Sequence, residues 1–209
     1  MESYRRLVAF DLDGTLNRTE LYAIDAYKET FKELNIGPFS DNEIKSRFGA
    51  PFEEDIKYFL GNDSTRLENL YKELLLKNWN KYLNINARTY DGVPDILDSL
   101  RKKGYILAIC SNAPIDEIDN TLEVLKIKDK FHYIQGLTIK NNKEDSLNIL
   151  INKAKADLVY MVGDRFYDYK AAKKNKSIFI GCLYGYGKEE LCKAEYLIND
   201  IKELDDILR

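Results

Sequence analysis

Apolar residues recur along this chain with two different periods, and the change of period divides the sequence. The continuous apolar run Leu7-Val8-Ala9-Phe10 is typical of a short buried strand. From residue 17 to about residue 87 the apolar positions recur at helical spacing, and no strand pattern interrupts them. Beyond Tyr90-Asp91-Gly92, short apolar runs alternate with helical patterns. This alternation predicts an α/β fold with a doubly wound parallel sheet and a helical insert after its first strand.

Turn and capping residues give approximate boundaries for these elements. Gly37-Pro38 ends the first helical pattern, and Ser40-Asp41-Asn42-Glu43 has the form of a capping box that begins a short helix. Further helices are predicted over residues 53–60, 64–84 and 168–174, around Ile96, Ile118 and Leu150, and from Ile201 to the end. Strands are predicted at residues 105–110, 132–134, 158–162, 177–182 and 196–198.

Polar residues that can carry chemistry follow the ends of the predicted strands. They are Asp11 and Asp13 after the first strand, Ser111 and Asn112 after the second, and Asp164 and Asp168 after the run 158–162. Carboxyl ends of parallel strands meet at one edge of a sheet, where ligands bind. Mg²⁺ prefers carboxylate oxygens, and a lysine together with the metal can neutralise phosphate. The sequence therefore predicts a magnesium site that faces a phosphate group.

Each of these residues also has a plain structural interpretation. Asp-x-Asp-Gly occurs in ordinary turns and in calcium loops, and Ser111, Asn112 or Asp168 can cap a following helix. A lysine in the basic stretch 140–143 can be a solvated surface residue. The arrangement of the strand ends, rather than any single motif, favours the site.

Composition narrows the class of protein. The chain has 209 residues, 44% of them hydrophobic and 32% charged, which is typical of a globular protein. A net charge of −3 gives no basic surface for nucleic acid, and no apolar run approaches the roughly 20 residues of a membrane span. The single histidine, His132, argues against a histidine triad or zinc site, and three cysteines without metal-ligand spacing suit a reducing compartment. We expect a cytoplasmic monomer or weak homodimer.

The strand-end motifs together resemble those of the haloacid dehalogenase-like hydrolases. The matching stretches are Asp11-Leu12-Asp13-Gly14-Thr15-Leu16, Cys110-Ser111-Asn112 and Gly163-Asp164-Arg165-Phe166-Tyr167-Asp168. The resemblance covers essentially the whole chain and is to the phosphoglycolate-phosphatase-like subfamily, in which a cap is inserted after the first motif. It implies a Rossmann-like core of residues 1–16 and 88–209 and an all-helical cap of residues 17–87.

The resemblance also implies a role for each motif residue. Asp11 would be the nucleophile and Asp13 the general acid and base. Mg²⁺ would be held by Asp11, the backbone carbonyl of Asp13, Asp164 and Asp168, while Thr15, Ser111, Asn112 and Lys143 would bind phosphate. The third motif is a lysine before a helix, for which Lys143 is favoured over Lys140 because Lys143-Glu144-Asp145-Ser146 at a helix start resembles the sequence of members of this family.

The implied activity is Mg²⁺-dependent hydrolysis of a small phosphate monoester, phosphoglycolate-like or nucleotide-like, through an aspartyl-phosphate. Arg18 and Arg47 are candidates to bind a substrate carboxylate or second phosphate, although either can be a solvated surface residue. One alternative is a β-phosphoglucomutase-like phosphotransferase, which is disfavoured because the histidine expected after the first motif is missing. Another alternative, a non-enzymatic phosphate-binding regulatory protein, would be expected to lack Asp11 or Asp13.

Overall fold

The computed structural model describes residues 4–138 and 142–209 of the chain. Within these residues six parallel strands form one sheet in the order β3-β2-β1-β4-β5-β6. The strands are β1 Arg6–Phe10, β2 Ile106–Cys110, β3 Tyr133–Gln135, β4 Leu158–Gly163, β5 Ile178–Cys182 and β6 Tyr196–Ile198. Strand β1 pairs on one side with β2 and on the other with β4, so that Val8 lies opposite both Leu107 and Tyr160. The predicted parallel α/β sheet is confirmed.

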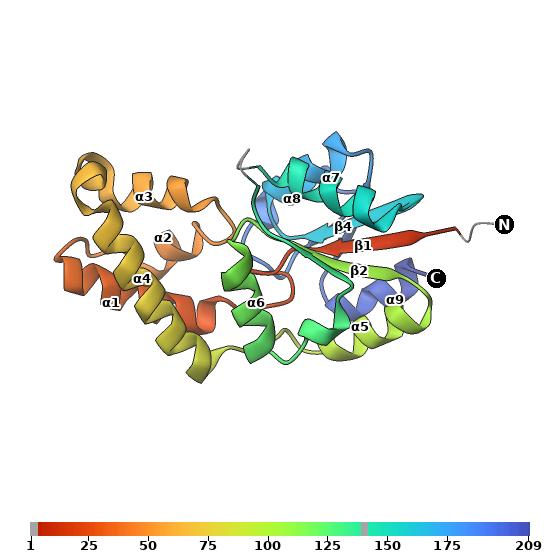
Figure 1. The fold of residues 1–209 in the computed structure, drawn as a ribbon, viewed down its shortest axis with the longest axis horizontal. Coiled ribbons are helices and arrows are strands. Elements are labelled where there is room, and N and C mark those ends of the chain that lie inside the picture. Colours follow the sequence, from red (N-terminus) through yellow and green to blue (C-terminus); the bar gives the residue numbers. More distant parts are fainter. Residues whose placement is uncertain (1–3, 139–141) are drawn as a thin grey trace.

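Helices cover both faces of the sheet (Figure 1). One face packs against α5 Val93–Lys102, α6 Ile115–Val124 and α9 Leu204–Ile207, and the other against α7 Lys143–Ala154 and α8 Phe166–Lys174. Val8 and Phe10 point into the first layer, whereas Leu7 and Ala9 point into the second. Because successive side chains of a strand point to opposite faces, a strand covered on both faces is apolar throughout.

Residues 17–87 form a helical insert between β1 and α5, seen at the left of Figure 1. Its helices are α1 Glu20–Leu34, α2 Asp41–Lys45, α3 Phe52–Leu60 and α4 Ser64–Asn86. They enclose a hydrophobic cluster of their own, built around Tyr22, Phe31, Phe59 and Tyr71. The predicted capping box begins α2, since the Glu43 N–H donates to Ser40 Oγ at 3.2 Å and the Ser40 N–H donates to Glu43 Oε2 at 2.8 Å.

The structure differs from the predicted boundaries at two helix ends. Helix α8 begins at Phe166 rather than at Asp168, because the Asp168 carboxylate accepts the Arg165 N–H and caps the start of the helix. The end of the chain is a 3₁₀ turn, Ile201–Glu203, followed by the short helix α9, instead of one continuous helix. Further 3₁₀ turns lie at Gly61–Asp63, Lys128–Lys130 and Lys188–Glu190.

The direction in which the chain adds strands reverses at β1, which lies between β2 and β4. Ligands of doubly wound folds bind at this reversal, beyond the carboxyl ends of the strands. Asp11 follows β1 and Asp164 follows β4 directly. The fold therefore brings two predicted site residues to the point where a ligand is expected. Across residues 4–138 and 142–209, no helix has both the length and the apolar character that a membrane crossing requires.

Candidate active site

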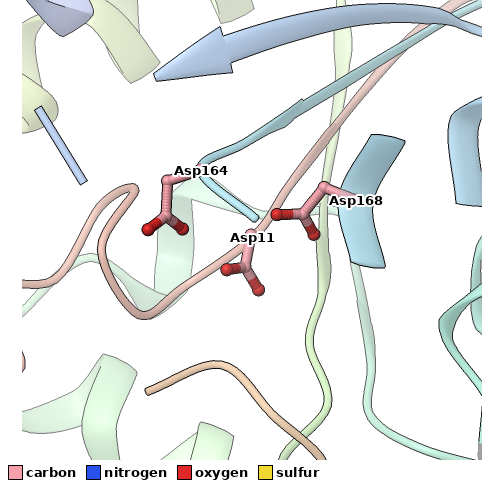
Figure 2. A group of neighbouring side chains, drawn as sticks. All are labelled: Asp11, Asp164 and Asp168. Carbon is pink, nitrogen blue, oxygen red and sulfur yellow. The ribbon is translucent and has the colours of Figure 1, made fainter. Parts of the chain in front are cut away.

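Three carboxylates gather at the carboxyl ends of the central strands, and we call them the acid cluster. They belong to Asp11, Asp164 and Asp168, and one oxygen from each lies within 4.8 Å of the others (Figure 2). Asp11 follows β1, Asp164 follows β4, and Asp168 reaches in from α8. All three are almost completely buried. The parallel register of β1 and β4 and the start of α8 are what bring these distant residues together.

Lys143, the first residue of α7, provides a buried cation beside the acid cluster. Its Nζ lies 2.5 Å from Asp11 Oδ1 and 2.6 Å from Asp168 Oδ1. Burial lowers the pKa of the Lys143 ammonium, but the two carboxylates outweigh this effect and the pKa is raised overall. Lys143 therefore stays charged and holds one oxygen of Asp11 in place. Lys140, the other lysine considered from the sequence, lies outside the described residues.

Negative charge in the acid cluster exceeds the charge of Lys143. Burial raises the pKa of Asp11 well above its usual value, and the Asp168 and Asp164 carboxylates raise it further against the effect of Lys143. Burial, followed by the charge of Asp168, raises the pKa of Asp164 to about 7. Three buried carboxylates beside one ammonium leave a site that favours an additional cation.

The donor set of the acid cluster fits Mg²⁺. Carboxylate oxygens are the hard ligands that this ion prefers, and a few of them suffice because Mg²⁺ keeps several waters. Asp11 Oδ2 is buried and has no hydrogen-bond partner among the residues that the structure describes. A buried carboxylate oxygen without a donor is costly, and a bound cation would satisfy it. Among the described residues, Asp11, Asp164 and Asp168 therefore form a group that could hold a divalent cation.

Backbone and hydroxyl groups orient Asp164. The Tyr186 N–H donates to Asp164 Oδ2 at 2.6 Å, and the Thr15 hydroxyl donates to Oδ1 at 3.4 Å. Gly14 has φ +81°, and a Cβ there would lie 2.5 Å from Asp164 Oδ2. Glycine is needed because both the backbone conformation and this close approach exclude a side chain. The Thr15 hydroxyl, expected from the sequence to bind phosphate, is thus turned toward Asp164.

Asp13 lies outside the acid cluster and lines a cavity instead. Its Oδ1 accepts hydrogen bonds from the Thr19 hydroxyl at 2.5 Å and from Asn17 Nδ2 at 3.1 Å. Burial nevertheless raises the pKa of the Asp13 carboxyl. A carboxyl whose protonated form is favoured, and whose orientation is fixed, suits proton transfer. No role for Asn17 and Thr19 was expected from the sequence, because only the turn at the start of the insert brings them back to Asp13.

A cavity of about 480 Å³ lies between the sheet edge and the helical insert. The sheet side contributes Asp13, Ser111 and Asn112, and the insert side contributes the segment around Phe48 together with part of α4. Arg47 lines this cavity, but its Nε lies 3.1 Å from Asp55 Oδ1 and its Nη2 lies 3.4 Å from Glu54 Oε2. Among the two arginines singled out from the sequence, Arg47 is thus the one at the cavity, and it is already paired.

Arg18 lies elsewhere. Its side chain is 44% exposed and pairs with Glu20 at 3.1 Å. It lines a second cavity of about 630 Å³, which also contacts the loop carrying Tyr184 and Tyr186. The structure therefore does not bring Arg18 together with Asp13 and the acid cluster.

Ser111 and Asn112 lie where β2 ends, as expected, but each makes a local contact. Ser111 Oγ accepts the Ala113 N–H at 3.2 Å, which begins the turn into α6. Asn112 Nδ2 donates to the Gly49 carbonyl of the insert at 2.8 Å. Asn112 therefore joins the sheet edge to the insert in addition to lining the cavity.

Arg165 makes the second connection between the sheet edge and the insert. Its Nη1 donates to the backbone carbonyls of Ser46 and Phe48, and its Nη2 lies 3.1 Å from Glu190 Oε1. No role for Arg165 was expected from the sequence, in which its only signal is its position directly after Asp164. Together, Arg165 and Asn112 hold the loop between α2 and α3 against the site.

Comparisons with known proteins point to one family. The family model described as haloacid dehalogenase-like hydrolase matches residues 8–182. The pyrophosphatase PpaX of Listeria monocytogenes serotype 4b (strain CLIP80459) is 27% identical over 210 residues, which cover 96% of this chain and 94% of that protein. A phosphoglycolate phosphatase of Agrobacterium fabrum is 28% identical over 214 residues, covering 97% of this chain and 91% of the relative.

A solved structure agrees with this match. The crystal structure of a predicted phosphatase from Clostridium acetobutylicum superposes with a TM-score of 0.81 at 25% sequence identity, and the alignment covers 99% of both chains. The similarity therefore includes the helical insert as well as the sheet.

Proposed function

Because this chain belongs to the haloacid dehalogenase-like hydrolases, we propose that it is a Mg²⁺-dependent phosphatase that hydrolyses a small phosphate monoester through an aspartyl-phosphate on Asp11. The observation that carries the proposal is the pairing of Asp11 with Lys143 at the end of β1, with Asp13 two residues further along at the wall of a cavity. The proposed nucleophile, Asp11, and the proposed proton-transfer group, Asp13, are thus two residues apart in the chain. Asp11 lies in the acid cluster, whereas Asp13 lines the cavity.

In this proposal the Asp11 carboxylate attacks the phosphorus atom, and the bond to the leaving oxygen breaks. Lys143 holds Oδ1 of this carboxylate, which fixes the orientation of the nucleophile. The covalent step divides one difficult displacement into two easier ones. Water then attacks the phosphorus of the aspartyl-phosphate and restores the Asp11 carboxylate.

Asp13 moves the proton in both steps. Its raised pKa favours a protonated carboxyl, which donates a proton to the leaving oxygen. The resulting carboxylate takes a proton from the attacking water in the second step. Asn17 and Thr19 keep the carboxyl oriented toward the cavity through both steps.

Asp11, Asp164, Asp168 and the backbone carbonyl of Asp13 would hold Mg²⁺. The metal would supply positive charge that offsets the charge of the phosphoryl oxygens. Ser111, Asn112 and Lys143 are the proposed phosphate contacts, with Thr15 supporting Asp164. Residues 17–87 are the proposed cap, which excludes water and contacts the leaving group.

Phosphate release is the direct test. The protein would be assayed with Mg²⁺ on phosphoglycolate, nucleoside monophosphates, sugar phosphates and pyrophosphate, with a chelator and with Mg²⁺ added back. We expect hydrolysis that the chelator abolishes and Mg²⁺ restores. Full activity in chelator would remove the metal from the proposal. Absence of release from every substrate, with Mg²⁺ shown to bind by calorimetry, would favour a phosphate-binding protein or a phosphotransferase.

A further inference from the structure

The walls of the 480 Å³ cavity restrict the chemistry of the leaving group. The volume lies in the range of about 300–1,000 Å³ that is typical of pockets for larger small molecules. Glycolate or a second phosphate would leave most of this space to water. The leaving group that fills the cavity is therefore larger than those of phosphoglycolate and pyrophosphate.

The side of the cavity formed by the insert is largely apolar and aromatic. It includes Phe48, Phe52, Leu75 and Trp79. Trp79 packs edge-on against Tyr22 with ring centroids 5.1 Å apart, and Phe52 stacks on Tyr71 at 5.8 Å. These contacts fix the rings in place, so the wall is rigid and favours an apolar body or a cation above a ring face.

The cations of this cavity are already neutralised. Among the described residues they are Arg47 and Lys72. Arg47 pairs with Asp55 and Glu54, and Lys72 Nζ lies 2.6 Å from Glu68 Oε1. A substrate carboxylate or second phosphate would therefore have to compete with Asp55 and Glu54 for Arg47 and with Glu68 for Lys72.

Glu117 gives the cavity an excess of negative charge. It lies in the first turn of α6, lines the cavity, and has no hydrogen-bond or ion-pair partner within residues 4–138 and 142–209. Burial, and then the neighbouring charges of Asp116 and Asp13, raise the pKa of the Glu117 carboxyl to about 7. A partly buried carboxylate in this position would be stabilised by a cationic group on the ligand.

We infer that the substrate is the phosphate monoester of an amino alcohol, whose apolar body packs against Phe48 and Trp79 and whose ammonium group pairs with Glu117. This inference rests on the proposed phosphatase function and specifies its leaving group. Asp13 and Glu117 line the same cavity, and the Asp13 carboxyl lies close enough to raise the pKa of Glu117, so the ammonium group would be bound in the cavity that also holds the proposed proton-transfer group.

A matched series of substrates tests the inference. The series comprises 2-phenylethyl phosphate and its para-aminomethyl and para-carboxy derivatives, which differ in charge but keep the same alcohol, and phosphoglycolate and pyrophosphate are assayed beside them. We expect kcat/KM to be highest for the cationic member and about tenfold or more lower for the anionic member and for phosphoglycolate. A kcat/KM for the neutral, carboxylated or glycolate substrate that equals or exceeds the cationic one would overturn the inference.

Two variants assign the preference to Glu117. Glu117→Gln should reduce the ratio of cationic to neutral kcat/KM to about one, through KM rather than kcat. Glu123→Gln removes an exposed carboxylate of the same helix that does not line the cavity, and it should keep the wild-type ratio. An unchanged ratio in Glu117→Gln would reject this assignment. Absence of hydrolysis of every substrate, phosphoglycolate included, would instead reject the phosphatase function itself.

Discussion

Two charged regions of the molecule, the acid cluster and the insert side of the cavity, differ in how well their charges are matched. In the acid cluster, three buried carboxylates face the single ammonium of Lys143. On the insert side of the cavity, Arg47 faces both Asp55 and Glu54, and the Tyr27 hydroxyl donates to Asp55 at 2.6 Å. The acid cluster therefore has fewer cations than carboxylates. On the insert side of the cavity, by contrast, the guanidinium of Arg47 is already paired with two carboxylates.

This difference in charge suits the acid cluster to catalysis and the Arg47 pairs to stabilising the fold. A region with too few cations is stabilised when a metal ion binds there, and its unpaired carboxylates remain available for catalysis. An arginine held by two carboxylates mainly stabilises the loop that carries it. An arginine near a cavity is thus evidence for binding a substrate anion only if its guanidinium is not already paired.

The largest expected effect is the loss of turnover in the acid cluster. Asp11→Asn replaces the proposed nucleophile by an amide that cannot form the aspartyl-phosphate, so phosphate release should fall by about 10³-fold or more. Asparagine has nearly the same shape, so circular dichroism and thermal unfolding should stay close to wild type. Retained activity in a folded Asp11→Asn protein would contradict the mechanism.

The next effect is on stability in the same region. Lys143→Met leaves Asp11 and Asp168 without their buried counter-charge, and in chelator it should lower the free energy of unfolding by about 3–5 kcal/mol. The matched control, Lys170→Met, removes a lysine that is 58% exposed from its pair with Glu144 and should cost at most about 1 kcal/mol. Urea denaturation measures both values. Equal small losses would mean that the acid cluster does not depend on its lysine.

A smaller effect is expected from the insert side of the cavity. Arg47→Ala leaves Asp55, whose pKa burial raises to about 6, without its guanidinium, and should reduce stability by about 2 kcal/mol at pH 8. Adding Asp55→Asn should restore part of that loss. The kcat for a substrate without a second anion should change by less than about threefold. A kcat loss like that of the Asp11 variant would place Arg47 in the chemistry.

The smallest effect concerns pH. The folded-state pKa of Glu117 is about 7, above its ordinary value of 4.5, so the folded protein binds this proton more tightly than the unfolded chain. Its contribution to stability is complete below about pH 4.5 and is lost as pH rises toward 7. A shift of this size in a fully buried group would correspond to about 3 kcal/mol. Because Glu117 is only partly buried and solvent screens its charge, Glu117→Gln should gain about 1 kcal/mol relative to wild type between pH 4.5 and pH 8, measured by denaturation at each pH. A constant difference would mean that the carboxyl is solvated normally.

The parts of this structure that follow from local patterns are the ones that can be predicted from the sequence. The apolar run of β1 and the polar residues after it place Asp11 at the edge of a parallel sheet, and strand β4 does the same for Asp164. These positions follow from the two-residue period of a strand and from the parallel alternation of strands and helices. The capping box at Ser40 is equally local, since its two hydrogen bonds join residues three positions apart.

Tertiary contacts decided which partners each side chain of the site has. The Lys143 ammonium meets Asp11 across 132 positions of sequence, and the Asn112 amide meets the Gly49 carbonyl across 63. The engagement of Arg47 by Asp55 and the position of Glu117 at the cavity likewise depend on how the helices pack. The sequence by itself determined the fold class and the edge of the sheet where the acidic residues meet, because backbone periodicity is local. Only the tertiary structure decided which charges are already paired, because a side chain's partners are set by packing between distant segments.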